Sequence, residues 1–407
     1  MELFSGIGAQ HMALERSGVP YEIVGICDID PYAVQAYEAI HGPAPMLGET
    51  KDSQGRRIGD VTKIAHIPKD VDILTYSFPC TDLSQANSKG KGLKGEHSGL
   101  LWAVQDILEQ ADEDGRLPRY LIMENVPQVF AKKNSKDWNR WMDFLSSLGY
   151  TSTSGTLNAK DFPGTGQNRN RAFVVSHLGT ECPPLPVPTG GDTVLGDVLE
   201  KSVDSKYYLT GKRLKGMEKS SAKEGARGNG FRFEPVDRSS VSHAITTKEG
   251  SRKTSNFVRD PSRCQQIGTV EGMGSGKFES TKRVYSGKGI SPTVTRCQGG
   301  QCEPKVLEGR SDVRKITPKE AWRLQSFGKR RRDGTWDDSA YEKAAASGLS
   351  DTRLYGMAGN SINVNVFQAI VSEIDRFDSK TDGGRKGQKS MEAFGGEVKR
   401  GKSRRSS

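Results

Sequence analysis

ILTYSFPCTDLS, residues 73–84, and YLIMENV, residues 120–126, decide the fold of this chain. Each begins as an apolar run of strand length and ends at chemically active residues. In an α/β sheet, functional groups gather where strands end. We therefore expect Cys80, a candidate nucleophile, and Glu124, a candidate acid, to lie together at one edge of a sheet. A thiolate beside a carboxyl group suits attack on a flat, electron-poor ring, such as a nucleic-acid base, followed by proton delivery.

Residues 1–178 alternate short apolar runs with helical patterns, as βαβ units do, and predict a doubly wound α/β sheet. The proline-rich stretch CPPLPVP (182–188) marks a boundary. The expected strands cover 1–4, 22–27, 73–76, 120–123, 151–157 and 172–177, and the expected helices cover 9–17, 32–40, 100–110 and 138–148.

Residues 189–312 show only short, weakly periodic runs rich in Gly, Ser, Lys and Arg, and we expect no long helix there. A helix is expected over 317–327, with Thr317 as N-cap and Pro318 in the first turn. Another is expected over 361–377. The tail from 379 is rich in Gly, Lys, Arg and Ser and is expected to be disordered.

Composition limits the class of protein. The chain has 407 residues, enough for a sizeable core, and no apolar run of the roughly 18–20 residues that a membrane span needs. We expect no signal peptide and no membrane association. The six cysteines form no paired CxxC pattern, so we expect reduced thiols in a cytoplasmic protein. The same spacing makes a zinc site improbable, and we expect no metal.

The net charge of +10 is unevenly distributed. Residues 1–180 carry −4 and residues 181–354 carry +10, while 355–378 carry −2 and the tail carries +6. A basic surface on one part of a protein is typical of polyphosphate binding, although a soluble basic surface is the alternative.

The stretch LFSGIG, residues 3–8, predicts a tight turn between a strand and a helix, where glycines let a ligand approach the backbone. An ordinary βα turn is the alternative. Asp28 and Asp60 follow later strands and could accept hydrogen bonds from a ribose and an adenine amino group, so an adenosine ligand is favoured. His11 stands where a dinucleotide fingerprint has its third glycine, which weakens a nicotinamide interpretation.

Cys80 taken alone would more often be a small buried side chain. Pro79 precedes it, however, and residues 81–99 form a polar segment with glycines and lysines, a plausible mobile lid beside a thiol. Glu124, at the end of an apolar strand, should be desolvated, which raises a carboxyl pKa; a structural Glu is the alternative. Arg169 and Arg171 should emerge on the same side of an extended segment and could hold a base carbonyl, a phosphate or Glu124 itself.

Together these motifs resemble the DNA cytosine-C5 methyltransferases of bacterial and phage type. LFSGIG is similar to their cofactor loop, SFPC to their nucleophile motif, ENV to their acid motif and QNRNR to their arginine motif. ITPKEAWRLQSF resembles the motif bordering the recognition domain, and YGMAGNSINVNV the final cofactor motif. All occur in family order, over about 1–178 and 314–377.

The resemblance implies a Rossmann-like S-adenosylmethionine-dependent methyltransferase sheet with a smaller, basic target-recognition domain. It implies a catalytic and cofactor-binding domain over 1–180 completed by 355–378, a recognition domain over 181–354 and a basic tail over 379–407. It also implies base flipping, a covalent Cys80 adduct, and S-adenosylhomocysteine as product. The implied catalytic residues are Cys80, Glu124, Arg169 and Arg171, and the implied cofactor-binding residues are Phe4, Ser5, Gly6, Gly8, Asp28, Ile29, Asp60, Val61, Pro79, Leu100, Asn360 and Ser361.

Two positions depart from the family pattern: Thr81 stands where the family usually has Gln, and Ile29 where an aromatic residue often stacks on adenine. The leading hypothesis is a sequence-specific methyltransferase acting on double-stranded DNA as a monomer, encoded by a bacterium or phage. A cognate restriction endonuclease would act on the same DNA site without binding the methyltransferase directly. The alternatives are a tRNA cytosine-C5 methyltransferase, disfavoured by the large basic insert, and a catalytically silent DNA-binding protein, disfavoured by the intact catalytic set.

Overall fold

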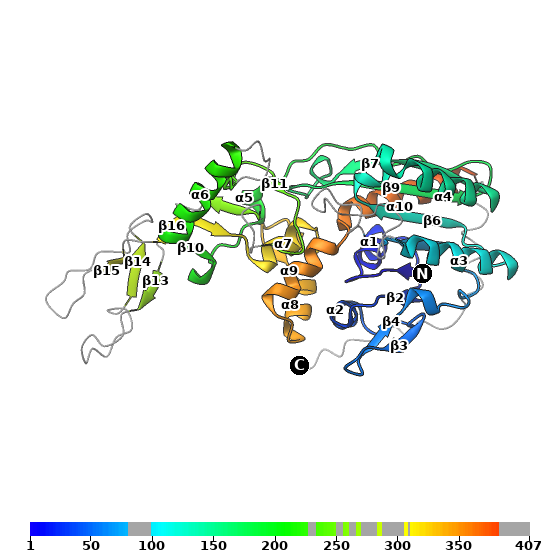
Figure 1. The fold of residues 1–407 in the computed structure, drawn as a ribbon, viewed down its shortest axis with the longest axis horizontal. Helices are drawn as coiled ribbons and strands as arrows, with labels where there is room; N and C mark the ends of the chain where they lie inside the picture. Colours follow the sequence, from blue (N-terminus) through cyan, green and yellow to red (C-terminus); the bar gives the residue numbers. More distant parts are fainter. Residues whose placement is uncertain are drawn as a thin grey trace, which may run out of the picture.

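The computed structural model describes residues 1–79, 99–226, 233–249, 255–259, 266–269, 283–286, 305–307 and 310–381. Its main sheet has six strands in the order β2-β1-β5-β6-β9-β7 (Figure 1). The first four are parallel, and β9 runs antiparallel to both β6 and β7. The expected α/β sheet is confirmed, with an antiparallel end that alternation along the chain does not predict. The strands are β1 (Glu2–Leu3), β2 (Ile26–Cys27), β5 (Ile73–Tyr76), β6 (Tyr120–Asn125), β7 (Tyr150–Asn158) and β9 (Asn170–Leu178).

All six residues of β6 are buried, because helices cover both faces of the sheet. Tyr120 and Ile122 belong to one hydrophobic cluster, and Leu121 and Met123 belong to another. This alternation follows from the opposite directions of successive side chains in a strand. Helices α1 (Ala9–Ser17), α2 (Pro31–His41) and α10 (Val364–Thr381) contribute to the first cluster, and α3 (Leu100–Glu113) and α4 (Ser135–Ser147) contribute to the second.

Helix α10 begins later and ends later than the sequence predicts. It starts at Val364 because the Oδ1 atom of Asn363 accepts hydrogen bonds from the backbone N–H groups of Asn365 and Val366, as an N-cap residue does. It ends at Thr381, so residues 379–381 belong to the helix and not to the expected tail. Residues 382–407 lie outside the described residues.

The basic central region has its own small sheet, in the order β10-β16-β12. These strands are β10 (Tyr208–Thr210), β16 (Arg310–Lys315) and β12 (Phe257–Arg259). Their small core is covered by α6 (Gly211–Ala226), so the expectation of no long helix in this region was wrong. Only Leu214 and Met217 of α6 pack against that core, which explains why its apolar periodicity is weak. A second small sheet contains β13 (Gln266–Thr269), β14 (Arg283–Ser286) and β15 (Lys305–Leu307).

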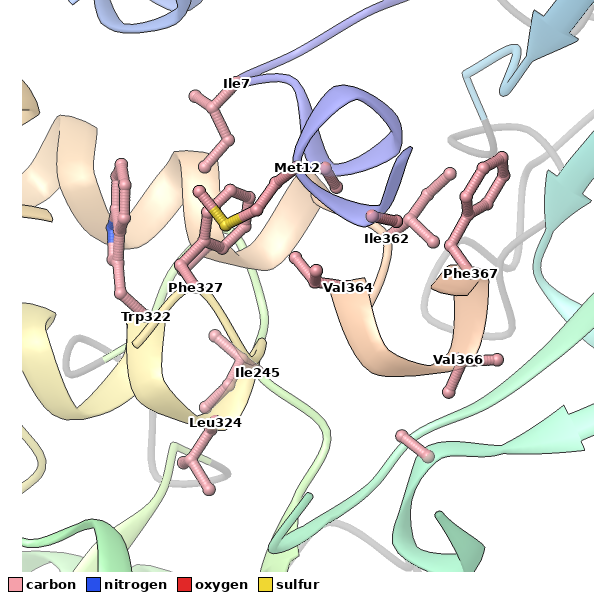
Figure 2. Close-up of a cluster of buried hydrophobic side chains, with 14 of the residues drawn as sticks. Ile7, Met12, Ile245, Trp322, Leu324, Phe327, Ile362, Val364, Val366 and Phe367 are labelled. Carbon is pink, nitrogen blue, oxygen red and sulfur yellow. The ribbon is translucent and has the colours of Figure 1, made fainter. Parts of the chain in front are cut away.

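Three helices lie between the two regions in Figure 1: α7 (Pro318–Leu324), α8 (Ser339–Ala346) and α9 (Asp351–Asn360). Thr317 caps α7 as expected, and Glu320 completes a capping box with it. Figure 2 shows Trp322 and Phe327 in the same buried cluster as Ile7 and Met12, at the start of the chain. The base of the LFSGIG turn is therefore built by residues more than 300 positions away. The division of the chain into domains stays a prediction.

Candidate active site

The LFSGIG turn leaves the sheet at the edge where β1 and β2 end. Leu3 pairs with Cys27, so the residues after each strand emerge side by side. The backbone N–H of Ser5 donates to the Cys27 carbonyl (3.0 Å), and that of Gly6 donates to Asp28 Oδ2 (2.7 Å). The Asp28 carboxylate thus fixes the turn at its tightest point.

Backbone angles explain the glycines of the turn. Phe4, Gly6 and Gly8 have φ values of 55°, 55° and 75°, in the left-handed region that favours glycine. A Cβ atom at Gly6 would meet nothing within 4 Å, whereas one at Gly8 would lie 2.5 Å from His41 Nε2. Gly8 is therefore needed because a side chain there would clash with His41. The space around Gly6 is open, so a ligand could approach the backbone there.

Asp28 and Asp60 lie close together, although they follow strands of different sheets. The backbone N–H of Gly59 donates to the Asp28 carbonyl (2.7 Å), and Asp60 follows β4 (Arg57–Gly59). That strand belongs to a separate hairpin with β3 (Glu49–Lys51), not to the main sheet. Burial raises the pKa of Asp28 to about 6, in spite of hydrogen bonds that it accepts from Gly6 and Asp30.

The surroundings of these acids fit an adenosine ligand. The side chain of Ile29 is 60% exposed, an unusual state for an isoleucine at the edge of a core, and could pack on a flat ring. The buried Oγ atom of Ser5 has no hydrogen-bond partner among the described residues and could accept one from a ligand. Val61 is buried next to Asp60. Asn360 is exposed at the end of α9 and Ser361 follows it, buried, just before Ile362 of the cluster in Figure 2.

The ends of β5 and β6 lie beside this turn. Tyr76 pairs with Leu3 on one side and with Met123 on the other. The Asn125 side chain donates a hydrogen bond to the Phe78 carbonyl (3.0 Å), so the SFP and ENV segments are joined directly. Pro79 is the last described residue before 80–98, and Leu100 opens α3 on the far side of that stretch.

Cys80 and the glycine- and lysine-rich stretch that follows lie outside the described residues. The position of the Cys80 thiol beside Glu124 and the proposed lid therefore stay predictions. The described chain reaches Pro79, one residue before Cys80, and Asn125 holds the preceding residue, Phe78.

Glu124 lies next to Asn125 in β6, and its side chain is buried. Arg171 Nε lies 3.1 Å from its Oε1 atom, although this ion pair lacks hydrogen-bond geometry and Oε1 has no hydrogen-bond partner among the described residues. Burial raises the pKa of Glu124, whereas the nearby Arg171 and Arg169 guanidinium groups lower it less strongly. The expected upward shift is confirmed. A carboxyl group in this state holds its proton more readily than one in water, as a proton donor requires.

Arg169 has hydrogen-bond partners that the sequence did not suggest. Its guanidinium group is buried and donates hydrogen bonds to the carbonyls of Ile245 (3.1 Å), Gly359 (3.0 Å) and Ser361 (2.8 Å). Arg171 makes an ion pair with Glu124, and Arg169 lies near enough to lower the pKa of that carboxyl group. The acceptors of Arg169 lie 76 to 192 positions along the chain, beyond the reach of any local pattern.

Two residues of this site were not singled out from the sequence. Asn125 belongs to the ENV motif, and Gln167 belongs to the QNRNR motif, where its buried side chain bonds to the backbone of Leu324 and Ile245. Their places inside the motifs were the available signal. Among the described residues, no group of three or more His, Cys, Asp or Glu side chains could hold a metal ion, and no described helix is long and apolar enough to span a membrane.

Comparison with protein families gives one match over nearly the whole chain: the model of the C-5 cytosine-specific DNA methylases covers residues 1–376. The chain belongs to this family. Of the motifs quoted above, LFSGIG and ENV lie at ends of strands of the main sheet, whereas the last two lie on α7 and α9.

Among curated methylases, the chain is 28% identical to the type II methyltransferase M2.ScrFI of Lactococcus lactis subsp. cremoris, over 92% of this chain and 98% of that one. It is 29% identical to the orphan methyltransferase M.SssI of Spiroplasma monobiae, over 92% and 96%. Among solved structures, the fold is similar to that of the Entamoeba histolytica methyltransferase EhMeth, with a TM-score of 0.60, 17% identity and coverage of 92% and 97%.

Proposed function

We propose that this methylase transfers a methyl group from S-adenosylmethionine to carbon C5 of a cytosine flipped out of double-stranded DNA. One observation carries the proposal: Glu124 is a buried acid with a raised pKa, paired with Arg171, at the same sheet edge as a glycine turn fixed by Asp28. A base and an adenosine cofactor would then meet between these two groups.

The residues of the glycine turn fit S-adenosylmethionine. Asp28 and Asp60 would accept hydrogen bonds from the ribose and adenine, Ile29 would pack on the adenine ring, and Ser5 would use its unpaired Oγ. Asn360 and Ser361 would close the site from α9. When bound, the cofactor supplies an electrophilic methyl group.

Cys80 and Glu124 would perform the remaining chemistry on the base. The Cys80 thiolate adds to C6 while Glu124 gives a proton to N3, so the ring becomes an enamine whose C5 is nucleophilic. After C5 is methylated, its proton passes to solvent water acting as base and the C6–sulfur bond breaks, which restores the aromatic ring and the thiolate; N3 then returns its proton to Glu124. Arg171 holds Glu124 in place, and removal of the base from the stack is needed because C5 and C6 are inaccessible to the sulfur inside a duplex.

The experiment that tests this proposal offers methyl-labelled S-adenosylmethionine with duplex DNA or with tRNA. We expect label on C5 of cytosine in the duplex. Label in tRNA alone would favour the alternative substrate, and binding of duplex without any transfer would favour a catalytically silent DNA-binding protein.

The target would be a short sequence read by the basic region, as sequence-specific methylation requires, and bisulfite sequencing of DNA from expressing cells would identify it. A monomer in the cytoplasm, a bacterial or phage origin and a cognate endonuclease that acts on the same site stay predictions. The relatives include both type II and orphan methyltransferases, so they favour neither presence nor absence of an endonuclease.

A further inference from the structure

Residues 242–247, here called the bridging segment, lie between two motifs of the proposed active site. Strand β11 (Ser242–His243) pairs in parallel with β8 (Gln167–Asn168) of the arginine motif. On its other side, the segment approaches Gly359 closely: a Cβ atom there would lie 2.4 Å from Thr246 C and from Thr247 N. The segment therefore fills the space between the QNRNR and AGNS motifs.

Ile245 is held on both sides of its peptide backbone. Gln167 Oε1 accepts from its N–H (2.8 Å), and Arg169 donates to its carbonyl (3.1 Å). The Gln167 amide also donates to the Leu324 carbonyl (2.9 Å). The Ile245 side chain is 1% exposed and belongs to the cluster around Leu324 shown in Figure 2. Burial of the side chain and hydrogen bonds to both the backbone N–H and the carbonyl hold Ile245 in a single position.

The other end of the bridging segment is fixed to the small sheet of the basic region. Asn256, buried just before β12, accepts a hydrogen bond from His243 N (2.8 Å) and donates one to the His243 carbonyl (3.2 Å). Its own carbonyl accepts from Ile316 N (3.2 Å), after β16. A shift of that sheet would thus be passed through Asn256 to His243, two residues before Ile245.

Arg169 joins this segment to the proposed cofactor site. The same guanidinium group that holds the Ile245 carbonyl also donates to the carbonyls of Gly359 and Ser361, on either side of Asn360. A planar guanidinium can serve three fixed acceptors, which the single ammonium group of lysine cannot do with the same geometry.

We infer that Arg169 is a positioning residue for both substrates: it fixes the bridging segment of the recognition region against the backbone around Asn360 and does not touch the reacting base. This inference rests on the proposed function and extends it. It makes the placement of DNA and the placement of cofactor depend on one side chain.

The test is steady-state kinetics of Arg169→Met with both substrates varied. We expect the KM for S-adenosylmethionine and the KM for duplex DNA each to rise at least fivefold, with kcat at saturation within threefold of the native value. Such a split marks lost binding rather than lost chemistry. A fall of kcat by a hundredfold with unchanged KM values would overturn the inference, and so would a rise of only one KM.

Two further variants separate geometry from charge and from folding. Arg169→Lys keeps the charge near Glu124 and should still raise both KM values; recovery of native values would overturn the inference. Gly359→Ala adds a Cβ where the bridging segment lies and should raise both KM values with Arg169 intact. Glu22→Gln, at an exposed position outside the site motifs and the basic region, is the control expected to leave both unchanged.

Native protein is measured first, so that failure of the proposed methyltransferase function can be told apart from failure of the positioning role of Arg169. Native protein that binds S-adenosylhomocysteine and duplex DNA yet transfers no methyl group would reject the proposed function. Native protein that methylates DNA, with Gly359→Ala and both Arg169 variants unchanged in KM, would reject the role of Arg169 alone.

Discussion

Glu124 ends a strand in which every side chain is buried, and its chemistry follows from that position. A carboxyl group in water is ionised at neutral pH, but burial raises the pKa of Glu124 more than the two arginines lower it. Arg171 remains close enough to stabilise the anion once a proton has left. The same residue can therefore give up a proton to a ring nitrogen and take it back within one cycle.

Cys80→Ala should abolish methyl transfer and leave cofactor affinity within about twofold, because the thiolate is needed only for addition to C6. Transfer is measured with labelled S-adenosylmethionine, and cofactor affinity by calorimetry with S-adenosylhomocysteine. Cys182→Ala, at a free and half-buried cysteine, is the matched control and should retain transfer. Turnover by the Cys80 variant above background would refute the covalent mechanism.

Glu2 is another buried acid, 1% exposed beneath the glycine turn, and burial raises its pKa from 4.5 to about 7. Its folded pKa lies above its unfolded pKa, so the folded state binds the extra proton between about pH 4.5 and 7. Stability is then greatest below pH 4.5 and is lost as the pH rises through about 7. The groups that lower its pKa, first the N-terminal ammonium of Met1 and then Tyr37 and His11, do not offset burial.

Glu2→Gln should remove this pH dependence. At pH 8 the variant should be more stable than the native protein by about 1–3 kcal/mol, and near pH 4 the difference should vanish. Urea unfolding at pH 4, 6 and 8 measures it, with the exposed Glu22→Gln as control. If the free energy of unfolding depended on pH in the same way for native protein and variant, the raised pKa of Glu2 would be contradicted.

At the scale of elements, β16 and α7 are joined by a buried ion pair. Arg314 donates to both carboxylate oxygens of Glu320, at 2.8 and 2.9 Å, and neither side chain is exposed to solvent. Glu320 also accepts from the backbone N–H groups of Thr317 and Glu200. One carboxylate thus caps α7, binds the strand before it and holds the chain near residue 200.

Arg314→Met should lower the free energy of unfolding by about 3–5 kcal/mol, because it leaves the Glu320 carboxylate buried without its countercharge. Arg330→Met is the matched control: its ion pair with Asp197 is largely exposed and should contribute less than about 1 kcal/mol. Urea unfolding monitored by tryptophan fluorescence gives both values. A loss below 1 kcal/mol for Arg314→Met would show that the pair is not buried in solution.

The elements also show which parts of the fold a sequence can predict. Helix α1 has the predicted bounds, and Thr317 caps α7, because local composition specifies both. Helix α6 was missed because only Leu214 and Met217 face a core, and the antiparallel β9 because strand order depends on pairing across the sheet. The pKa direction of Glu124 followed from its strand, whereas the partners of Arg169 come from distant segments that no local pattern contains.

Across the whole molecule, the charges are segregated. Residues 1–180, with the glycine turn and Glu124, carry a net charge of −4, and residues 181–354 carry +10. The negative net charge of residues 1–180 would repel the phosphate backbone, so we expect attraction to DNA to come from the central region and from residues 379–407, which carry +6. Such attraction releases counterions and depends on salt.

We expect the affinity for duplex DNA to fall steeply with salt, by about 10³-fold between 50 and 200 mM if about six phosphates are contacted. Fluorescence anisotropy with labelled duplex measures it. S-adenosylhomocysteine affinity in the same buffers is the control and should change little, since the proposed cofactor site makes few ionic contacts. A flat titration with DNA would contradict the assignment of the basic region to DNA binding.

The position of residues 242–247 has a practical consequence for chimeric methylases. Exchanging the whole central region between two relatives would import a foreign peptide into the gap beside Gly359 and Arg169, even if the new specificity loops were sound. Grafts that keep these six residues of the host, and exchange only sequence beyond them, should yield active hybrids more often.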